Sequence, residues 1–179
     1  TVSVDYILRK PYAYLGDYEN VAIDVEGYMF PMTPFYTPKN IPEIYLGTGV
    51  MKEDEEVWTA LVGEEKLQYV FSLYEELLRY NAEERFLIKS IDISKVEEES
   101  AGQRYIVVAL EDNMKRGAAK TSYLLRMSPK GYEEAFKHFL ELYAYIHSHD
   151  DEAFDLETMA CMIVDLRIPD LAFVDTRSK

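Results

Sequence analysis

The chain has 179 residues, of which 48% are apolar, and its 15 Tyr and 8 Phe can supply large buried contacts, so it can fold as one domain with a packed core. Its 33 Asp and Glu against 19 Lys and Arg give a net charge of −14. That charge and the absence of a basic stripe interleaved with aromatics disfavour nucleic acid and anionic membranes as partners.

The N-terminal third of the chain contains short strand patterns. Alternation over Val2–Leu8 predicts a strand, and because the chain opens directly into it, we expect the sequence to be part of a longer protein. A short strand is expected over Tyr12–Leu15. Strands over Val21–Asp24 and Tyr28–Phe30 flank Gly27, which can adopt the positive φ of a tight hairpin turn.

A proline-rich segment follows. Four of the seven prolines lie within residues 31–42, and each removes an amide donor and fixes φ, which predicts an extended surface segment. Phe35 and Tyr36 are expected to hold it against the domain. Residues Glu64–Asn81 then predict an amphipathic helix with an apolar stripe formed by Leu67, Val70, Phe71, Tyr74, Leu77 and Leu78.

The central region is rich in branched and aromatic residues and predicts three further strands, over Leu87–Ile93, Tyr105–Leu110 and Thr121–Met127. The two connections, Ser94–Arg104 and Glu111–Lys120, carry many charges and are expected to be exposed.

The last part of the chain predicts a helix and two strands. Serine can cap a helix and proline is tolerated in its first turn, so Ser128-Pro129 indicates a start. Strands are expected over Met162–Leu166 and Leu171–Val174, separated by Ile168-Pro169-Asp170. The buried face of this second helix is expected to comprise Tyr132, Ala135, Phe136, Phe139, Tyr143 and Ile146.

This order of elements contains no repeated β-α-β unit and no internal repeat. It predicts the α+β class, with a mixed or antiparallel β-sheet and two main helices packed on one face.

Residues of catalytic type form no recognisable motif: there is no phosphate-binding glycine loop, nucleophile elbow, Cys-x-x-Cys pair or zinc-protease helix. The one cysteine, Cys161, lies in an apolar run and is interpreted as a small buried hydrophobe. His147, His149, Asp150 and Asp151 are all metal-ligand types, but they fall where the second helix is expected to end, and a solvated helix terminus is the favoured interpretation.

Four segments, in this order, resemble the extracytoplasmic β-domain of the bacterial cell-division family FtsQ/DivIB. Leu8–Tyr14 is similar to its charged-x-Pro-x-Ala segment, and Ile23–Phe30 to its Val-Asp-x-x-Gly-x-x-Phe hairpin. Ile41–Gly47 is similar to Leu-Pro-x-Leu-x-Gly with one extra residue. Ile163–Arg167, followed by Ala172–Val174, resembles the Val-Asp-Leu-Arg strand and the strand after it.

The resemblance covers roughly Val2–Val174. It departs in the proline-rich segment, around Val96–Gly102 and at Asn113–Lys120, and Arg126-Met127 replaces a Leu-Gly pair. It implies that residues 1–10 are the final strand of, or the linker from, an upstream POTRA-like domain, and that residues 11–179 form the β-domain.

The resemblance also implies a function without catalysis or cofactors. Such a domain is the periplasmic part of a single-pass inner-membrane scaffold, whose transmembrane helix would lie outside this chain. It recruits the coiled-coil proteins FtsB/DivIC and FtsL to the septum by strand addition at the last strand. The carried-over contact residues are Arg167, Ile168, Asp170, Ala172, Phe173 and Val174, with one of the last two expected in the core because strand faces alternate.

Two alternatives stay open from the sequence. One is an unrelated protein-interaction domain with the same order of elements. The other is a metal-assisted hydrolase that would use the His147, His149, Asp150 and Asp151 cluster.

Overall fold

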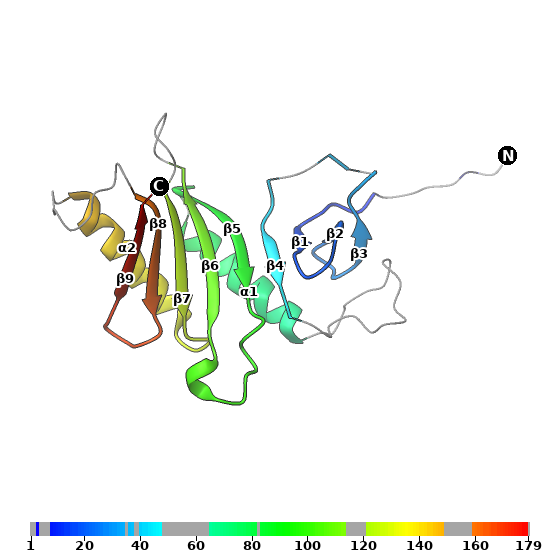
Figure 1. Ribbon diagram of the computed structural model, residues 1–179. Helices are drawn as coiled ribbons and strands as arrows, with labels where there is room; N and C mark the ends of the chain where they lie inside the picture. Colours follow the sequence, from blue (N-terminus) through cyan, green and yellow to red (C-terminus); the bar gives the residue numbers. More distant parts are fainter. Residues whose placement is uncertain are drawn as a thin grey trace.

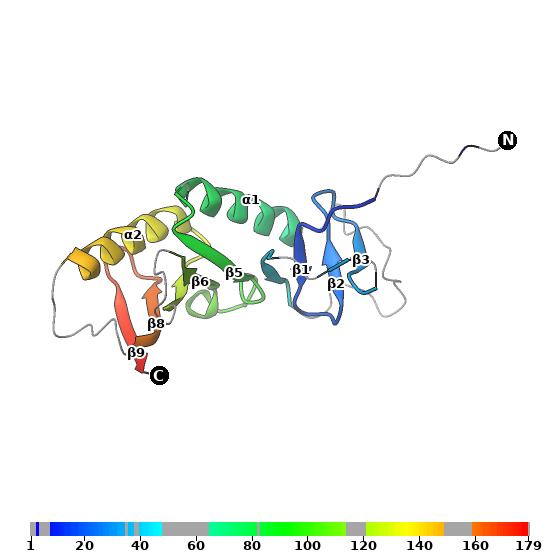
Figure 2. The ribbon, with the colours of Figure 1, turned by 90° about the horizontal axis from the view of Figure 1, so that it is seen from above.

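The computed structural model describes residues 3, 8–34, 36–37, 40–47, 65–81, 83–113, 121–148 and 159–178. They form one nine-stranded mixed sheet in the order β3-β2-β1-β4-β5-β6-β7-β8-β9, with both long helices on the same face (Figures 1 and 2). This confirms the predicted α+β class. No helix among these residues is long and apolar enough to cross a membrane.

The N-terminal strands are short and form one end of the sheet. They are β1 (Ala13–Leu15), β2 (Val21–Ile23) and β3 (Met29–Pro31). β2 pairs antiparallel with both β1 and β3. Gly27 lies between β2 and β3 with φ of +85°, which confirms the predicted hairpin. Most of the strand expected over Val2–Leu8 lies outside the described residues, and Leu8 itself is not in a strand.

The proline-rich segment is held by Tyr36, as expected: its ring packs on Phe30 and its hydroxyl donates to the carbonyl of Arg9. Phe35 lies outside the described residues. The segment leads into β4 (Glu43–Tyr45), a strand that the element analysis did not predict. Three residues flanked by prolines on one side are too short to show a strand periodicity.

Two β-α-β crossovers organise the rest of the sheet, contrary to the expectation that no such unit recurs. The first joins β4 through α1 (Glu65–Tyr80) to β5 (Phe86–Asp92), which is parallel to β4. The second joins β7 (Ser122–Met127) through α2 (Tyr132–Ser148) to β8 (Met159–Leu166), which is parallel to β7. β6 (Ile106–Asp112) pairs antiparallel with both β5 and β7.

Helix α2 spans Tyr132–Ser148, so the start predicted at Ser128-Pro129 is wrong. Gly131 has φ of +84°, a conformation outside the helical region, and its carbonyl accepts the first intrahelical bond from Ala135 at 3.1 Å. Glycine is therefore the cap here. Five of the six residues predicted for the inner face are buried, namely Ala135, Phe136, Phe139, Tyr143 and Ile146, and Tyr132 is partly buried against the core.

The core lies between the helices and one face of the sheet. Its largest contacts are made by a group of aromatic rings from β5, β7 and α2, namely Phe86, Tyr123, Phe139 and Tyr143, with centroids 4.9–6.3 Å apart. The Tyr143 hydroxyl donates to the buried carboxylate of Asp112 at 2.9 Å.

The apolar stripe of α1 is rotated slightly from the predicted one. Leu73 is fully buried although it was not among the predicted positions, and Leu78, which was, is exposed. Leu73 lies three residues from Val70 and four from Leu77, so it shares their face of the helix.

This difference yields a stability prediction. Leu73→Ala should lower the free energy of unfolding by about 2–5 kcal/mol because it leaves a cavity in the core. The exposed Leu78→Ala should change it by less than about 0.5 kcal/mol. Urea unfolding followed by circular dichroism measures both, and equal losses for the two variants would show that α1 buries a different face.

Candidate functional site

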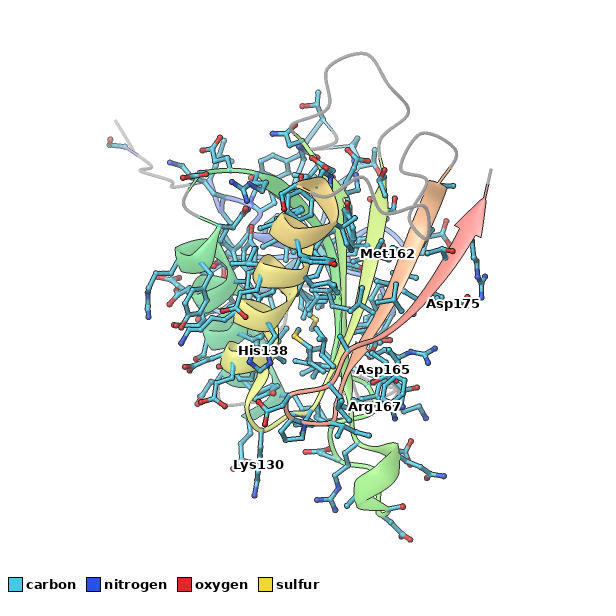
Figure 3. The ribbon with its side chains drawn as sticks, turned by 90° about the vertical axis from the view of Figure 1, so that its left-hand side faces the viewer. Lys130, His138, Met162, Asp165, Arg167 and Asp175 are labelled. Carbon is cyan, nitrogen blue, oxygen red and sulfur yellow. The ribbon has the colours of Figure 1, made fainter. Side chains whose placement is uncertain are left out.

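The candidate site is the C-terminal hairpin made by β8 (Met159–Leu166) and β9 (Phe173–Ser178). Met162, Val164 and Leu166 of β8 are buried on the helix side, whereas Ile163 and Asp165 lie on the other, open face. β9 pairs antiparallel with β8 and has no second neighbour among the described residues, so it is the terminal strand at this end of the sheet. Figure 3 views the molecule from this edge.

Two rows of side chains alternate along β9. Phe173 is 58% exposed and lies across from Asp165 on the open face, whereas Val174 is half-buried, lies across from Val164 and packs against the core. Val174 is thus the member of this pair that faces inward, as the alternation of strand faces requires.

The turn between the two strands exposes apolar side chains. The carbonyl of Ile168 accepts a hydrogen bond from the Leu171 amide at 3.3 Å, and Asp170 adopts a positive φ of +60°, a conformation that Asp tolerates. Ile168 and Leu171 are 51% and 53% exposed, and Ala172 is exposed as well. With Phe173 they give the hairpin tip an apolar surface.

Arg167 is held within the domain. Its Nε and Nη2 donate to the two carboxylate oxygens of Asp165 at 2.9 and 2.7 Å, and its Nη1 donates to the carbonyl of Gly102 at 3.4 Å. The guanidinium carbon lies 5.6 Å from the Tyr105 ring centre. Hydrogen bonding from Arg167 lowers the pKa of Asp165, so the carboxylate stays ionised.

A shallow cavity of about 310 Å³ lies beside this ion pair. It connects the hairpin tip to the β5–β6 connection, which contains a short 3-10 helix, Ala101–Gln103. Its lining mixes charged and apolar groups and comprises Ala101, Gly102, Arg104, Ser128, Asp165, Arg167, Ile168 and Phe173. Such a hollow can accept one side chain of a bound polypeptide.

The sequence analysis located part of this site and missed part of it. All six proposed contact residues lie on the hairpin, with Ile168, Asp170, Ala172 and Phe173 exposed. It ended the last strand at Val174, whereas β9 continues to Ser178. The missed segment, Asp175–Ser178, is too polar to stand out as a strand, although the alternation beginning at Phe173 was a signal that it continued.

The structure describes one residue of the predicted metal-ligand cluster, His147, and its contacts do not support a metal site. His147 stacks on Tyr143 with ring centres 4.0 Å apart, and its Nδ1 lies 2.9 Å from the Tyr143 carbonyl oxygen. His149, Asp150 and Asp151 lie outside the described residues. Among the residues that the structure does describe, no group of three His, Cys, Asp or Glu could hold a metal ion.

Cys161 is less buried than expected. It is half-buried on the open face of β8, across from Arg177, and burial raises the pKa of its thiol. A raised pKa keeps the thiol protonated and unreactive.

The comparisons with known proteins identify no family for this chain: no family model matches it, and no curated protein matches it either.

The Arg167–Asp165 pair predicts a pH dependence of stability. The pKa of Asp165 is lower in the folded state, so its contribution is present above the unfolded-state value of about 3.9 and is lost as the pH falls through the folded-state value. Because both side chains are partly exposed, Arg167→Gln should cost no more than about 1 kcal/mol at pH 7.

Urea unfolding at pH 7 and at acidic pH values well below the unfolded-state pKa of about 3.9 would measure this change, with Asp165→Asn as the control. The difference between the wild type and Arg167→Gln should shrink at acidic pH. A difference that stays constant would mean that Arg167 acts through Tyr105 and Gly102 and not through the carboxylate.

Proposed function

We propose that this domain is a non-enzymatic scaffold of the FtsQ/DivIB type, which binds a partner polypeptide by strand addition at β9. The observation that carries the proposal is the place of β9: among the described residues, β8 is its one neighbour in the sheet. A terminal strand presents a row of amide and carbonyl groups on its outer side, and an extended segment of another protein can pair with them.

The surface around β9 also supports this proposal. Ile168, Leu171 and Phe173 are the exposed large apolar residues of the hairpin tip, and the 310 Å³ cavity lies directly beside two of them. Clustered apolar side chains next to an open backbone edge provide binding energy and specificity together.

The same proposal names the partners and the compartment. The partners are the coiled-coil division proteins of the FtsB/DivIC and FtsL type, and the domain lies on the periplasmic side of the inner membrane, held there by a transmembrane helix elsewhere in the protein. The motifs that carry the resemblance include Ile163–Arg167 and Ala172–Val174, which form the second half of β8, the two ends of the turn and the start of β9.

Binding of the FtsB/DivIC-type protein from the same organism tests the proposal. Ile168→Asp and Ala172→Asp should each abolish detectable binding by isothermal titration, because a charge placed in a desolvated contact typically costs about 2 kcal/mol or more. Both residues are exposed, so circular dichroism and thermal unfolding should be unchanged.

Val25→Asp is the matched control. Val25 is an exposed apolar residue in the β2–β3 turn, and its strands lie at the far end of the sheet from β9. This variant adds the same charge and should bind as the wild type does. If all three variants bind the partner equally, the assignment of the binding surface to the hairpin is refuted.

A further inference from the structure

The surroundings of β9 differ on its two faces, and this difference restricts which strand can be added. On the helix face, the last turns of α2 extend beyond β9 and past the end of the sheet, as both ribbon views show (Figures 1 and 2). On that face, a strand added outside β9 would therefore lie beside the C-terminal half of α2, whereas no helix of the described residues covers the other face of β9.

The side of α2 that would face an added strand can be identified, because the opposite side of the helix is known. Leu140 lines a hollow with Tyr80 and Phe86, so it faces α1 and β5. At about 100° per residue, Leu142 and Tyr145 lie on the other side of the helix, toward the β9 end of the sheet. Leu142 is partly buried against the core and Tyr145 is 50% exposed.

Along β9, the row on this helix face is uncharged. Val174 is half-buried and Thr176 is exposed, and they lie across from the buried residues Val164 and Met162 of β8. Val174 and Leu142 pack against the same core cluster, and Thr176 and Tyr145 add no charge to this side of β9 and α2, so the helix side of β9 is suited to apolar side chains.

The open-face row of β9 carries opposite charges. Asp175 and Arg177 are exposed and lie directly across from Ile163 and Cys161 of β8, neither of which can neutralise them. A strand on the outer side of β9 would place side chains directly across from the same two residues, at the distance where opposite charges stabilise pairing.

From these two rows we infer that β9 selects a strand with a specific alternation. Side chains of the added strand that lie across from Val174 and Thr176 are apolar and pack under α2, while a base lies across from Asp175 and an acid across from Arg177. This inference rests on the proposed strand addition and adds to it the chemistry of the partner segment.

Two peptides with blocked termini test this alternation, Thr-Glu-Val-Lys-Ile-Tyr-Thr and its reverse. The first places these side chains across from β9 when it pairs antiparallel, and the reversed sequence places the same side chains there when it pairs parallel. Titration into the ¹⁵N-labelled domain should shift the amide resonances of β9 with one of them. A peptide in which Glu and Lys are exchanged should bind about tenfold more weakly, because two attractive cross-strand pairs become repulsive.

The reciprocal variant makes the test specific. The domain carrying both Asp175→Arg and Arg177→Asp should reverse this preference and bind the exchanged peptide better. On the helix side, Tyr145→Asp should weaken binding of either peptide, whereas Ala144→Asp should not, since Ala144 is exposed on another side of α2.

The outcomes separate the inference from the proposed function. In one outcome, Ile168→Asp abolishes binding of the FtsB/DivIC-type partner while peptide binding is unchanged by either charge exchange and by Tyr145→Asp. In that case strand addition stands and the inferred alternation is wrong. If neither peptide shifts the β9 resonances, the inferred partner chemistry is wrong.

A second copy of the chain is a competing occupant, because antiparallel pairing of two β9 strands about Thr176 would also bring Asp175 across from Arg177. The net charge of −14 on each copy opposes such a pairing. A dimer in sedimentation equilibrium that dissociates on Asp175→Arg would overturn the inference in favour of self-association.

Discussion

Backbone pairing across one continuous sheet is the constraint on which the rest of this structure depends. Each inner strand satisfies its amides and carbonyls with a neighbour on both sides, and a terminal strand can do so on one side only. The two crossovers through α1 and α2 fix the order of strands β4 to β8, and the final hairpin then places β9 at the end. The candidate binding surface follows from that order.

The layering of the domain decides which parts of this terminal strand are protected. Both helices cover one face, where Met162, Val164 and Leu166 of β8 are buried. β9 receives much less of this cover, since Val174 alone among the residues from Phe173 to Arg177 is half-buried. A strand with little burial on either face contributes little apolar surface to the core, and under the proposed function its charges and its exposed phenylalanine would serve to bind the partner.

Arg167 is one of the proposed contact residues, but its side chain makes its contacts within the domain. Its guanidinium is committed to Asp165, Gly102 and Tyr105, and these contacts join the hairpin to the β5–β6 connection. We therefore assign Arg167 the role of fixing the hairpin tip, on which Ile168 and Phe173 are displayed. Those apolar residues and β9 would then make the direct contacts with a partner.

The sequence by itself determined the α+β class, the β2–β3 hairpin, the existence of both helices and the buried face of α2, because these depend on local periodicity and turn chemistry. It also pointed to the hairpin as the candidate site. It did not determine β4, the start of α2 at Tyr132 or the burial of Leu73 in place of Leu78. These depend on non-local pairing and packing, which three-residue strands and a slightly rotated helix do not encode in their own periodicity. Only the tertiary structure decided that β9 continues through Asp175 and Arg177 at the end of the sheet and that α2 extends beyond it, since the place of a strand in a sheet is set by all the other strands.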